Sequence, residues 1–146
     1  MRKIILPIVT LMFVAACADK TKVEQSSSSI DEVTTQSVLD HHMKTFLGND
    51  LEGIMADYTE ESVLVTPNNT LKGITEIRDN FARVFTMLPK DSINFKMNKS
   101  LVVKDLAYII WECDAPKIKF EYGSDSFIVQ NGKIIRQTFA GIVTPK

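Results

Sequence analysis

Two residues of this 146-residue sequence, Asp125 and His42, combine a titratable side chain with an apolar setting. Asp125 shares its strand alternation with Phe127 and Val129, so the pattern places all three on one face of a predicted strand. Burial on an apolar face disfavours the charged carboxylate, which raises the pKa of Asp125 and lets its carboxyl donate a hydrogen bond at neutral pH. Two other interpretations stay open: the strand edge is open at this point, or Asp125 caps a bend beside Gly123.

His42 lies in a predicted helix, in register with the apolar residues Leu39, Met43 and Phe46, so it sits on or beside the buried face. An imidazole there can donate a hydrogen bond or exchange a proton near neutral pH. A histidine hydrogen-bonded at the helix edge is the alternative. His41 is rotated by about 100° on the same helix and is predicted to be solvated. Because helical metal ligands need i, i+4 spacing, we predict no metal site here and no cofactor.

Several aromatic side chains are candidates for the lining of a ligand pocket, although aromatic residues at such spacing also form ordinary cores. Glu112 has the alternation opposite to Trp111 and is predicted to face solvent. Cys113 is predicted to be a small buried hydrophobe rather than a nucleophile. Beside the catalytic candidates Asp125 and His42, the candidate pocket residues are Tyr58, Thr66, Phe85, Trp111, Phe120 and Phe127.

Three helices are predicted to carry the first of these residues. Ser29 and Glu32 fit the S-x-x-E capping box at the start of the first helix. Asp50 can cap a short second helix, and a third helix with one apolar face begins near Gly73. A strand over residues 62–66 lies between the second and third helices.

The rest of the chain is predicted to form strands. The change of alternation at Gly123-Ser124 predicts a bulge or bend. Asn131-Gly132 between two apolar runs predicts a two-residue hairpin turn. Helices followed by consecutive antiparallel strands are typical of an α+β fold. The strands are expected at 93–103, 106–113, 118–129 and 133–143.

Residues 1–16 (MRKIILPIVTLMFVAA) have the layout of a secretory signal peptide, with two basic residues ahead of an apolar run. The run is too short to cross about 30 Å of hydrocarbon, which takes about 20 helical residues. Its end, VAAC at 14–17, resembles the lipobox of bacterial lipoproteins. That resemblance implies cleavage before Cys17 and lipidation of its side chain. An ordinary signal peptide cut nearby and a buried apolar helix are the alternatives.

The segment 18–28 is polar and rich in serine, which predicts a flexible tether. We therefore expect a lipoprotein signal peptide at 1–16, lipidated Cys17 with its tether at 17–28, and a domain at 29–146. The lipoprotein resemblance implies a bacterial cell envelope location with a lipid anchor in the membrane. Ala18 rather than Asp follows the cysteine, and by the same resemblance this implies the outer rather than the inner membrane if the host is Gram-negative.

Composition excludes some classes of protein. The chain has 17 Lys and Arg against 18 Asp and Glu, a net charge of −1, so it lacks the basic excess of a nucleic-acid-binding protein. Its two cysteines are too few for a disulfide-dense scaffold or a four-cysteine zinc site. With Cys17 lipidated, Cys113 is expected to be a free thiol.

Four segments and Tyr58 resemble SnoaL-like proteins: GNDLEGIM at 48–55, VLVTP at 63–67, KGITEIR at 72–78 and DSFIVQNGKI at 125–134. This family belongs to the nuclear-transport-factor-2-like superfamily, which includes the ketosteroid isomerases. The resemblance covers residues 30–141. It implies a conical half-barrel, in which three N-terminal helices pack in a strongly curved antiparallel sheet around an apolar pocket.

The resemblance also suggests roles for three residues. Asp125 matches the protonated aspartate of the isomerase oxyanion hole, the worked case of a carboxylic acid kept neutral by an apolar site. His42 matches the catalytic tyrosine. Thr66 matches the general-base aspartate, and a threonine does not abstract a proton unaided at neutral pH. The arginine-bridged carboxylate pair of the related epoxide hydrolases is not evident.

Members of this superfamily include enzymes, binding proteins and interaction modules, so the fold leaves the function open. The leading interpretation is an envelope lipoprotein whose cone binds a small, mostly apolar molecule. One alternative is a noncatalytic module that dimerises or docks a partner. Another is an acid/base isomerase or cyclase that uses Asp125 and His42. A homodimer is expected in each case, because the resemblance implies one.

Overall fold

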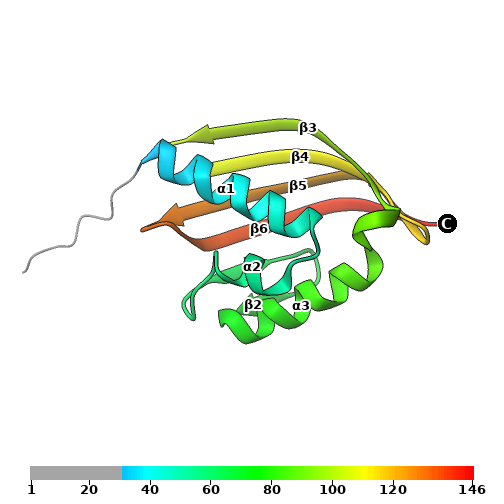
Figure 1. Ribbon diagram of the computed structural model, residues 1–146, viewed down its shortest axis with the longest axis horizontal. Helices are drawn as coiled ribbons and strands as arrows, with labels where there is room; N and C mark the ends of the chain where they lie inside the picture. Colours follow the sequence, from blue (N-terminus) through cyan, green and yellow to red (C-terminus); the bar gives the residue numbers. More distant parts are fainter. Residues whose placement is uncertain (1–30) are drawn as a thin grey trace, which may run out of the picture.

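The computed structural model describes residues 31–146 and shows three helices packed against one curved sheet (Figure 1). The signal peptide, Cys17 and the tether predicted for residues 1–28 lie outside the described residues. The helices are α1 (Glu32–Leu47), α2 (Leu51–Met55) and α3 (Gly73–Met87), with a 3-10 turn η1 (Lys90–Ser92). The strands are β1 (Val63–Val65), β2 (Thr70–Lys72), β3 (Asn94–Val103), β4 (Leu106–Asp114), β5 (Ile118–Gln130) and β6 (Lys133–Pro145).

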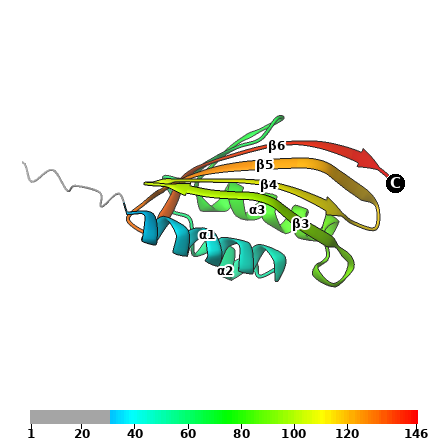
Figure 2. The same ribbon diagram turned by 90° about the horizontal axis from the view of Figure 1, so that it is seen from above.

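The six strands form one open sheet in the order β2-β1-β6-β5-β4-β3. All neighbouring strands are antiparallel except β1 and β6, which run parallel. The predicted antiparallel pairing therefore holds for every neighbouring pair except this one. Figure 2 shows the three helices on the same side of the sheet, which curves over them. This is the predicted α+β arrangement of helices inside a curved, unclosed sheet.

The first helix begins with a different cap from the predicted one. Asp31 is its N-cap residue, and the Asp31 carboxylate accepts hydrogen bonds from the backbone N–H groups of Val33 and Thr34. Glu32 does not complete a capping box, because its carboxylate accepts from the backbone N–H of Lys104, at 2.9 Å. The prediction of a Ser29–Glu32 capping box is therefore wrong. The Glu32 carboxylate bonds to the β3–β4 turn instead of to the backbone at the start of α1.

The middle of the chain follows its sequence signals closely, with one omission. Asp50 caps α2 by accepting from the N–H of Gly53, as predicted. Helix α3 buries Ile77 and Phe81 against the core. The strand β2 was not predicted, because three residues are too few to show an alternation. It forms a small hairpin with β1 that ends where α3 begins.

The strand β5 is continuous and contains a bulge, but not at the predicted position Gly123-Ser124. The irregularity in its pairing lies earlier, between Phe120 and Tyr122. It leaves Phe120 inside and Tyr122 on the outer face, 37% exposed. Gly123 serves a different purpose, because a Cβ there would lie only 2.5 Å from the indole of Trp111. The glycine makes room for that ring.

The hairpin between β5 and β6 has the predicted turn. Asn131 and Gly132 have φ angles of 52° and 71°, and Gln130 pairs with Lys133 across them. Two consecutive positive φ values are the requirement of the two-residue turn that Asn-Gly favours.

The core lies between the helices and the inner face of the sheet. On β4, the inward side chains are Ala107, Ile109, Trp111 and Cys113, each at most 5% exposed. Burial, with a smaller effect of the charge of Asp114, raises the pKa of the Cys113 thiol, which agrees with a buried hydrophobe. No helix within residues 31–146 is both long enough and apolar enough to cross a bilayer.

Candidate functional site

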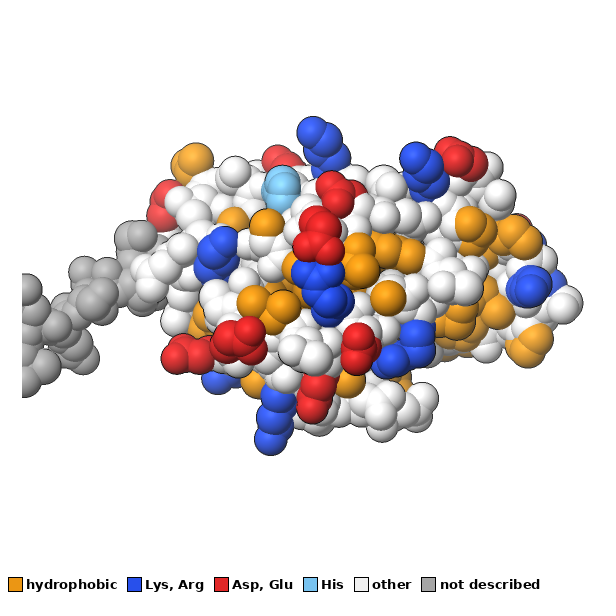
Figure 3. Space-filling view, turned by 60° about the horizontal axis from the view of Figure 1, so that its bottom comes forward, with side chains coloured by type: hydrophobic (Ala, Val, Ile, Leu, Met, Phe, Trp, Pro, Cys, Tyr) orange, Lys and Arg blue, Asp and Glu red, His pale blue; other side chains and the backbone are white. Residues whose placement is uncertain are grey.

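A cavity of about 320 Å³ lies between the helices and the inner face of the sheet. This volume is at the lower end of the range for small-molecule sites. The cavity reaches the surface beside Met87 and Val143, two lining residues that are 47% and 44% exposed. Figure 3 shows hydrophobic side chains gathered at this end of the molecule. An apolar molecule can therefore enter between the end of α3 and the end of β6.

The cavity wall is almost entirely apolar. Five polar side chains interrupt it: His42 on α1, Thr66 after β1, Asn80 on α3, Asp125 on β5 and Gln137 on β6. Apolar side chains from helix α1, from helix α3 and from strands β3 to β6 form this wall. It includes Phe46, Phe81, Val84, Phe95, Ile109, Trp111, Phe120, Phe127 and Phe139.

Asp125 projects into this wall from β5, as its alternation with Phe127 indicates. It is 7% exposed, and each of its carboxylate oxygens accepts one hydrogen bond. Trp111 donates Nε1–H to Oδ2 and Gln137 donates Nε2–H to Oδ1, both at 2.8 Å. Burial raises the pKa of Asp125, and the two hydrogen bonds and the nearby His42 oppose that shift without cancelling it.

Tyr58 completes the polar group around Asp125. Its hydroxyl donates to Oε1 of Gln137, which fixes the amide so that its N–H groups face Asp125. Burial raises the pKa of Tyr58 well above its ordinary value, and the charges of Asp125 and Asp57 add to this effect. Tyr58 therefore stays a neutral donor. The chain of hydrogen bonds from Tyr58 through Gln137 to Asp125 thus fixes the orientation of the carboxylate.

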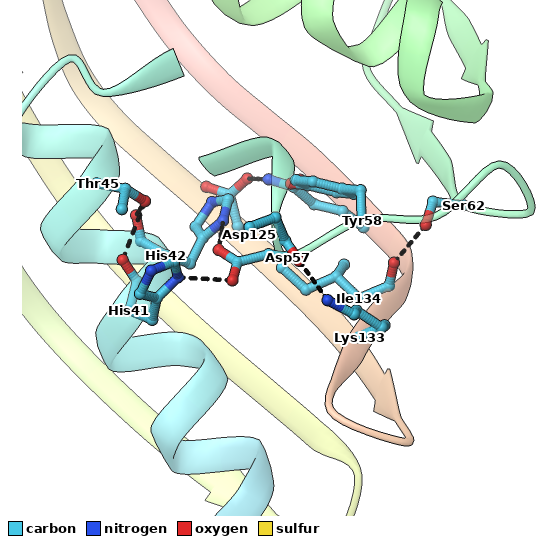
Figure 4. A network of polar contacts seen from close by, with 11 residues as sticks. His41, His42, Thr45, Asp57, Tyr58, Ser62, Asp125, Lys133 and Ile134 are labelled. Carbon is cyan, nitrogen blue, oxygen red and sulfur yellow. Dashed lines mark hydrogen bonds and ion pairs between the residues drawn. The ribbon is translucent and has the colours of Figure 1, made fainter. Parts of the chain in front are cut away.

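His42 faces the cavity from α1 and is 3% exposed. Its ring makes edge contacts with Phe127, Phe81 and Tyr58, with centroid distances of 5.1, 5.9 and 5.9 Å. On its other side, Nδ1 lies 3.4 Å from Oδ2 of Asp57. Figure 4 shows Asp57 with one carboxylate oxygen toward each of the two histidine rings. The histidine is thus held between an apolar wall and a buried carboxylate.

The structure brings most of the predicted pocket residues together. Thr66, Trp111, Phe120 and Phe127 line the cavity with Asp125 and His42. Tyr58 and Phe85 are not among the lining residues; each ring instead packs against Phe81, which lines the cavity. The Thr66 hydroxyl accepts from the backbone N–H of Asn69 at 3.0 Å, so it is held in the β1–β2 turn. Glu112 is on the outer face, as predicted, with 45% of its side chain exposed.

Three polar residues of the site were not predicted from the sequence: Gln137, Asn80 and Asp57. A pairing irregularity between Ile128 and Val129 shifts β6, so that Ile134 and Gln137 both point inward. Strict alternation would have put them on opposite faces. Asp57 follows a five-residue helix and has no local pattern that signals burial. His41 is exposed, as predicted, and its Nδ1 also lies 2.7 Å from Oδ1 of Asp57.

Within residues 31–146, no group of three or more His, Cys, Asp or Glu side chains is arranged to hold a metal ion. The polar groups that line the described cavity are a carboxyl group, an imidazole, two amides and a hydroxyl. Such groups can bind a polar substituent of a ligand or move a proton.

Solved structures of similar fold are numerous, although no curated protein sequence is significantly similar to this chain. A Kribbella flavida protein assigned as a ketosteroid isomerase has a TM-score of 0.64 and 14% identity, over 77% of this chain and 81% of that one. A Sinorhizobium meliloti protein assigned as a polyketide cyclase has a TM-score of 0.59 and 15% identity, over 71% and 94%. TerC, co-crystallised with polyporic acid, has a TM-score of 0.62 and 16% identity, over 75% and 92%.

At identities this low, the structural similarity shows the fold alone. The family is shown by sequence, because the model of the SnoaL-like domain matches residues 39–137. That match spans α1 to the middle of β6 and contains Asp125, His42, Asp57 and Gln137. The chain therefore belongs to the SnoaL-like domain family, within the nuclear-transport-factor-2-like superfamily.

Proposed function

We propose that this domain binds a small, mostly apolar molecule that carries one polar group. The observation that supports the proposal is the form of the cavity, which is apolar throughout except for a few polar side chains around Asp125. Burial of apolar ligand surface contributes about 25 cal/mol per Å². The polar group of the ligand then meets Asp125 and His42, which fixes its orientation. TerC, a protein of the same fold, has been crystallised with the small molecule polyporic acid.

Trp111 makes this binding measurable without a label. It is the only tryptophan of the chain, it lines the cavity, and its indole N–H donates to Asp125. Titration with phenylnaphthylamine, a neutral apolar fluorophore, is expected to change the Trp111 emission and to saturate at one molecule per domain. An Asp125→Leu variant is expected to keep the fold and change the affinity. Equal affinity in both proteins would contradict the role of Asp125.

A copurified ligand provides a second test. Native mass spectrometry of the domain from residue 29 onward is expected to show a bound mass that disappears on denaturation. A replacement that fills the cavity, Val84→Phe, is the matched control, because Val84 lines the cavity and is only partly buried. The same bound mass in both proteins would place the ligand elsewhere.

Acid/base catalysis is the second candidate function. It is favoured by two buried titratable groups, Asp125 and His42, that line the same cavity, and burial raises the pKa of Asp125. Isomerisation of the ketosteroid type begins when a general base removes a proton next to a carbonyl. Deuterium incorporation into tetralone, an apolar ketone with acidic hydrogens, is expected to be faster with the wild type than with Asp125→Asn or His42→Gln. Equal rates in all three would contradict catalysis.

We also propose that the mature protein is a lipoprotein of a bacterial cell envelope, anchored in the membrane through Cys17 and in the outer membrane if the host is Gram-negative. The VAAC sequence at 14–17 supports this proposal. Labelled fatty acid is expected to enter the wild-type protein and not Cys17→Ser. Equal labelling of both proteins would contradict the anchor.

The outer face of the sheet supports the proposal of a homodimer. Leu101 on β3, Leu106 on β4, Tyr122 on β5 and Ile142 on β6 lie there, exposed by 44%, 36%, 37% and 61%. A noncatalytic interaction module would use the same face. Light scattering after size exclusion is expected to give twice the monomer mass for the wild type. Tyr122→Lys with Ile142→Lys is expected to give the monomer mass, and a wild-type monomer would contradict the proposal.

A further inference from the structure

Behind the cavity, one buried carboxylate lies between the only two histidines of the chain. Asp57 is 5% exposed and follows α2, whereas His41 and His42 are neighbours on α1. Asp57 Oδ1 lies 2.7 Å from Nδ1 of His41, and Oδ2 lies 3.4 Å from Nδ1 of His42 (Figure 4). The His41 side chain is 47% exposed, while that of His42 is 4% exposed. One ring thus meets solvent and the other meets the cavity.

Two atoms of this cluster are buried without a hydrogen-bond partner among the described residues, and they face each other. They are Nδ1 of His42 and Oδ2 of Asp57. A buried polar atom without a partner is unfavourable, so each is expected to satisfy the other. A carboxylate oxygen can only accept. The pair therefore becomes a hydrogen bond when Nδ1 of His42 carries the proton, after a small rotation of either side chain.

The backbone around the pair is fixed on both sides. The Thr45 hydroxyl lies 3.0 Å from the carbonyl oxygens of both His41 and His42, in the same helix. The Asp57 carbonyl accepts from the N–H of Ile134 on β6, at 2.8 Å. These bonds fix the backbone that carries the imidazole and the carboxylate before any ligand enters, which favours a positioned proton acceptor.

We propose that Asp57 is a positioning residue that holds neutral His42 in the Nδ1–H tautomer and thereby directs the lone pair of Nε2 into the cavity. Nδ1 is buried against Asp57, so His42 meets the cavity with the remaining edge of its ring, where Nε2 lies. An acceptor at this point recognises an apolar ligand with an acidic O–H group, such as a phenol or an enol. This ligand class rests on the binding function proposed above.

The proton balance of the proposed contact is simple. The ligand O–H donates to Nε2 of His42, and when the proton moves the ligand becomes an oxyanion and the ring an imidazolium. The charge of that ring is then balanced by Asp57, while Nδ1–H stays in place. The other titratable groups that face His42 are Asp125 and Tyr58, and His41 shares Asp57 with it. Asp125 already accepts one bond at each oxygen.

The tautomer is measured directly by long-range nitrogen–proton NMR of the imidazole rings in the unliganded protein. The spectrum is simple because the chain contains two histidines, and His41→Gln leaves His42 alone. The wild type is expected to show His42 protonated at Nδ1 and unprotonated at Nε2. In Asp57→Asn, the side-chain NH2 group can only donate a hydrogen bond, whereas both carboxylate oxygens of Asp57 accept. The histidine that faces this NH2 group must therefore change its tautomer or lose its partner.

Asp40→Asn is the matched control. Asp40 lies on the exposed side of α1, the helix that carries both histidines, and it accepts from Gln36. Its replacement removes the same charge as Asp57→Asn without removing a contact with either ring. It is expected to leave both histidine spectra unchanged. A wild-type His42 protonated at Nε2, or a folded Asp57→Asn with both histidine tautomers and titration curves unchanged, would overturn the proposal.

The ligand class is tested by calorimetry with naphthol and its methyl ether, methoxynaphthalene, which differ in the O–H group. Naphthol is expected to bind the wild type about tenfold more tightly than the ether, and this preference is expected to vanish in Asp57→Asn. An equal preference in both proteins would overturn the proposal. A cavity that takes neither compound would contradict the binding function instead, because the tautomer is measured without any ligand.

Discussion

The replacement Gly123→Ala is expected to destabilise the domain because of the ring that lies over the glycine. A Cβ at this position would be 2.5 Å from Cε2 and 2.6 Å from Cζ2 of Trp111. Phe95 stacks on the indole at 5.5 Å and Phe120 lies 5.1 Å away, so the indole can yield to the new Cβ only by moving toward the cavity that it lines. The φ of Gly123 lies outside the positive region that requires glycine, so the effect is steric.

The expected loss has two parts. Overpacking of a core of this kind costs about 1–3 kcal/mol. A displaced indole also withdraws its hydrogen bond from Asp125, and a hydrogen bond to a charged group contributes about 1.5–3 kcal/mol. We therefore expect Gly123→Ala to lower the free energy of unfolding by about 2.5–6 kcal/mol at neutral pH.

The second part depends on the charge of Asp125. Without the Trp111 donor, the pKa of Asp125 in the folded protein rises further above its ordinary value of 3.8. A raised folded pKa means that stability is retained while the group is protonated and lost as the pH rises through that pKa. The deficit of Gly123→Ala is therefore expected to be smaller at mildly acidic pH than at neutral pH.

Urea denaturation followed by Trp111 fluorescence measures both effects. Ser126→Ala, an outward-facing change on the same strand, is the control and is expected to alter stability by no more than about 0.5 kcal/mol. Phe95→Leu in the Gly123→Ala protein is expected to recover part of the loss, because it makes room beside the indole. A loss below about 1 kcal/mol with an unchanged emission maximum would refute the steric argument.

Three further predictions concern single groups. Gly132→Ala is expected to lower the free energy of unfolding, measured by urea denaturation, by about 1–2 kcal/mol. The reason is conformational, because the φ of Gly132 is 71° and the nearest atom, on Thr34, is 4.0 Å from the new Cβ. An unchanged free energy of unfolding would contradict this prediction. Burial raises the pKa of Asp125, so the wild-type free energy of unfolding is expected to fall as the pH rises through that pKa, by about 1.4 kcal/mol per unit of elevation, and Asp125→Asn is expected to lack this slope. Parallel curves for the two proteins would speak against a raised pKa. In a Cys17→Ser protein, the buried Cys113 thiol is expected to react with iodoacetamide far more slowly when folded than in urea, and equal rates would show that it is accessible.

Much of the fold could be predicted because its signals are local. Asn131-Gly132 specifies a turn by its own φ angles, and Asp50 caps α2 with a bond to a residue three positions away. The apolar face of α3 follows from helical spacing. The cap of α1 could not be predicted in this way. Glu32 is taken by the backbone of Lys104, a partner that is close only in the folded state.

The candidate site divides in the same manner. Asp125 and His42 were found because strand alternation and helix register decide which way a side chain points. Gln137 was missed because its direction depends on a pairing irregularity in another part of the β5–β6 ladder. Asp57 was missed because its significance lies in the neighbours that the fold supplies, two histidines from a different helix.

The parallel pair of β1 and β6 also governs the order in which the domain can assemble. The strand β1 is made early, yet its partners beyond its own hairpin, Arg136 to Thr138, lie near the end of the chain. During synthesis, the three helices and the β1–β2 hairpin therefore emerge before the central strands that cover them. Long-range pairings of this kind form late, because the loop must close first. The native pairing of β1 can therefore be completed only after β6 has been synthesised.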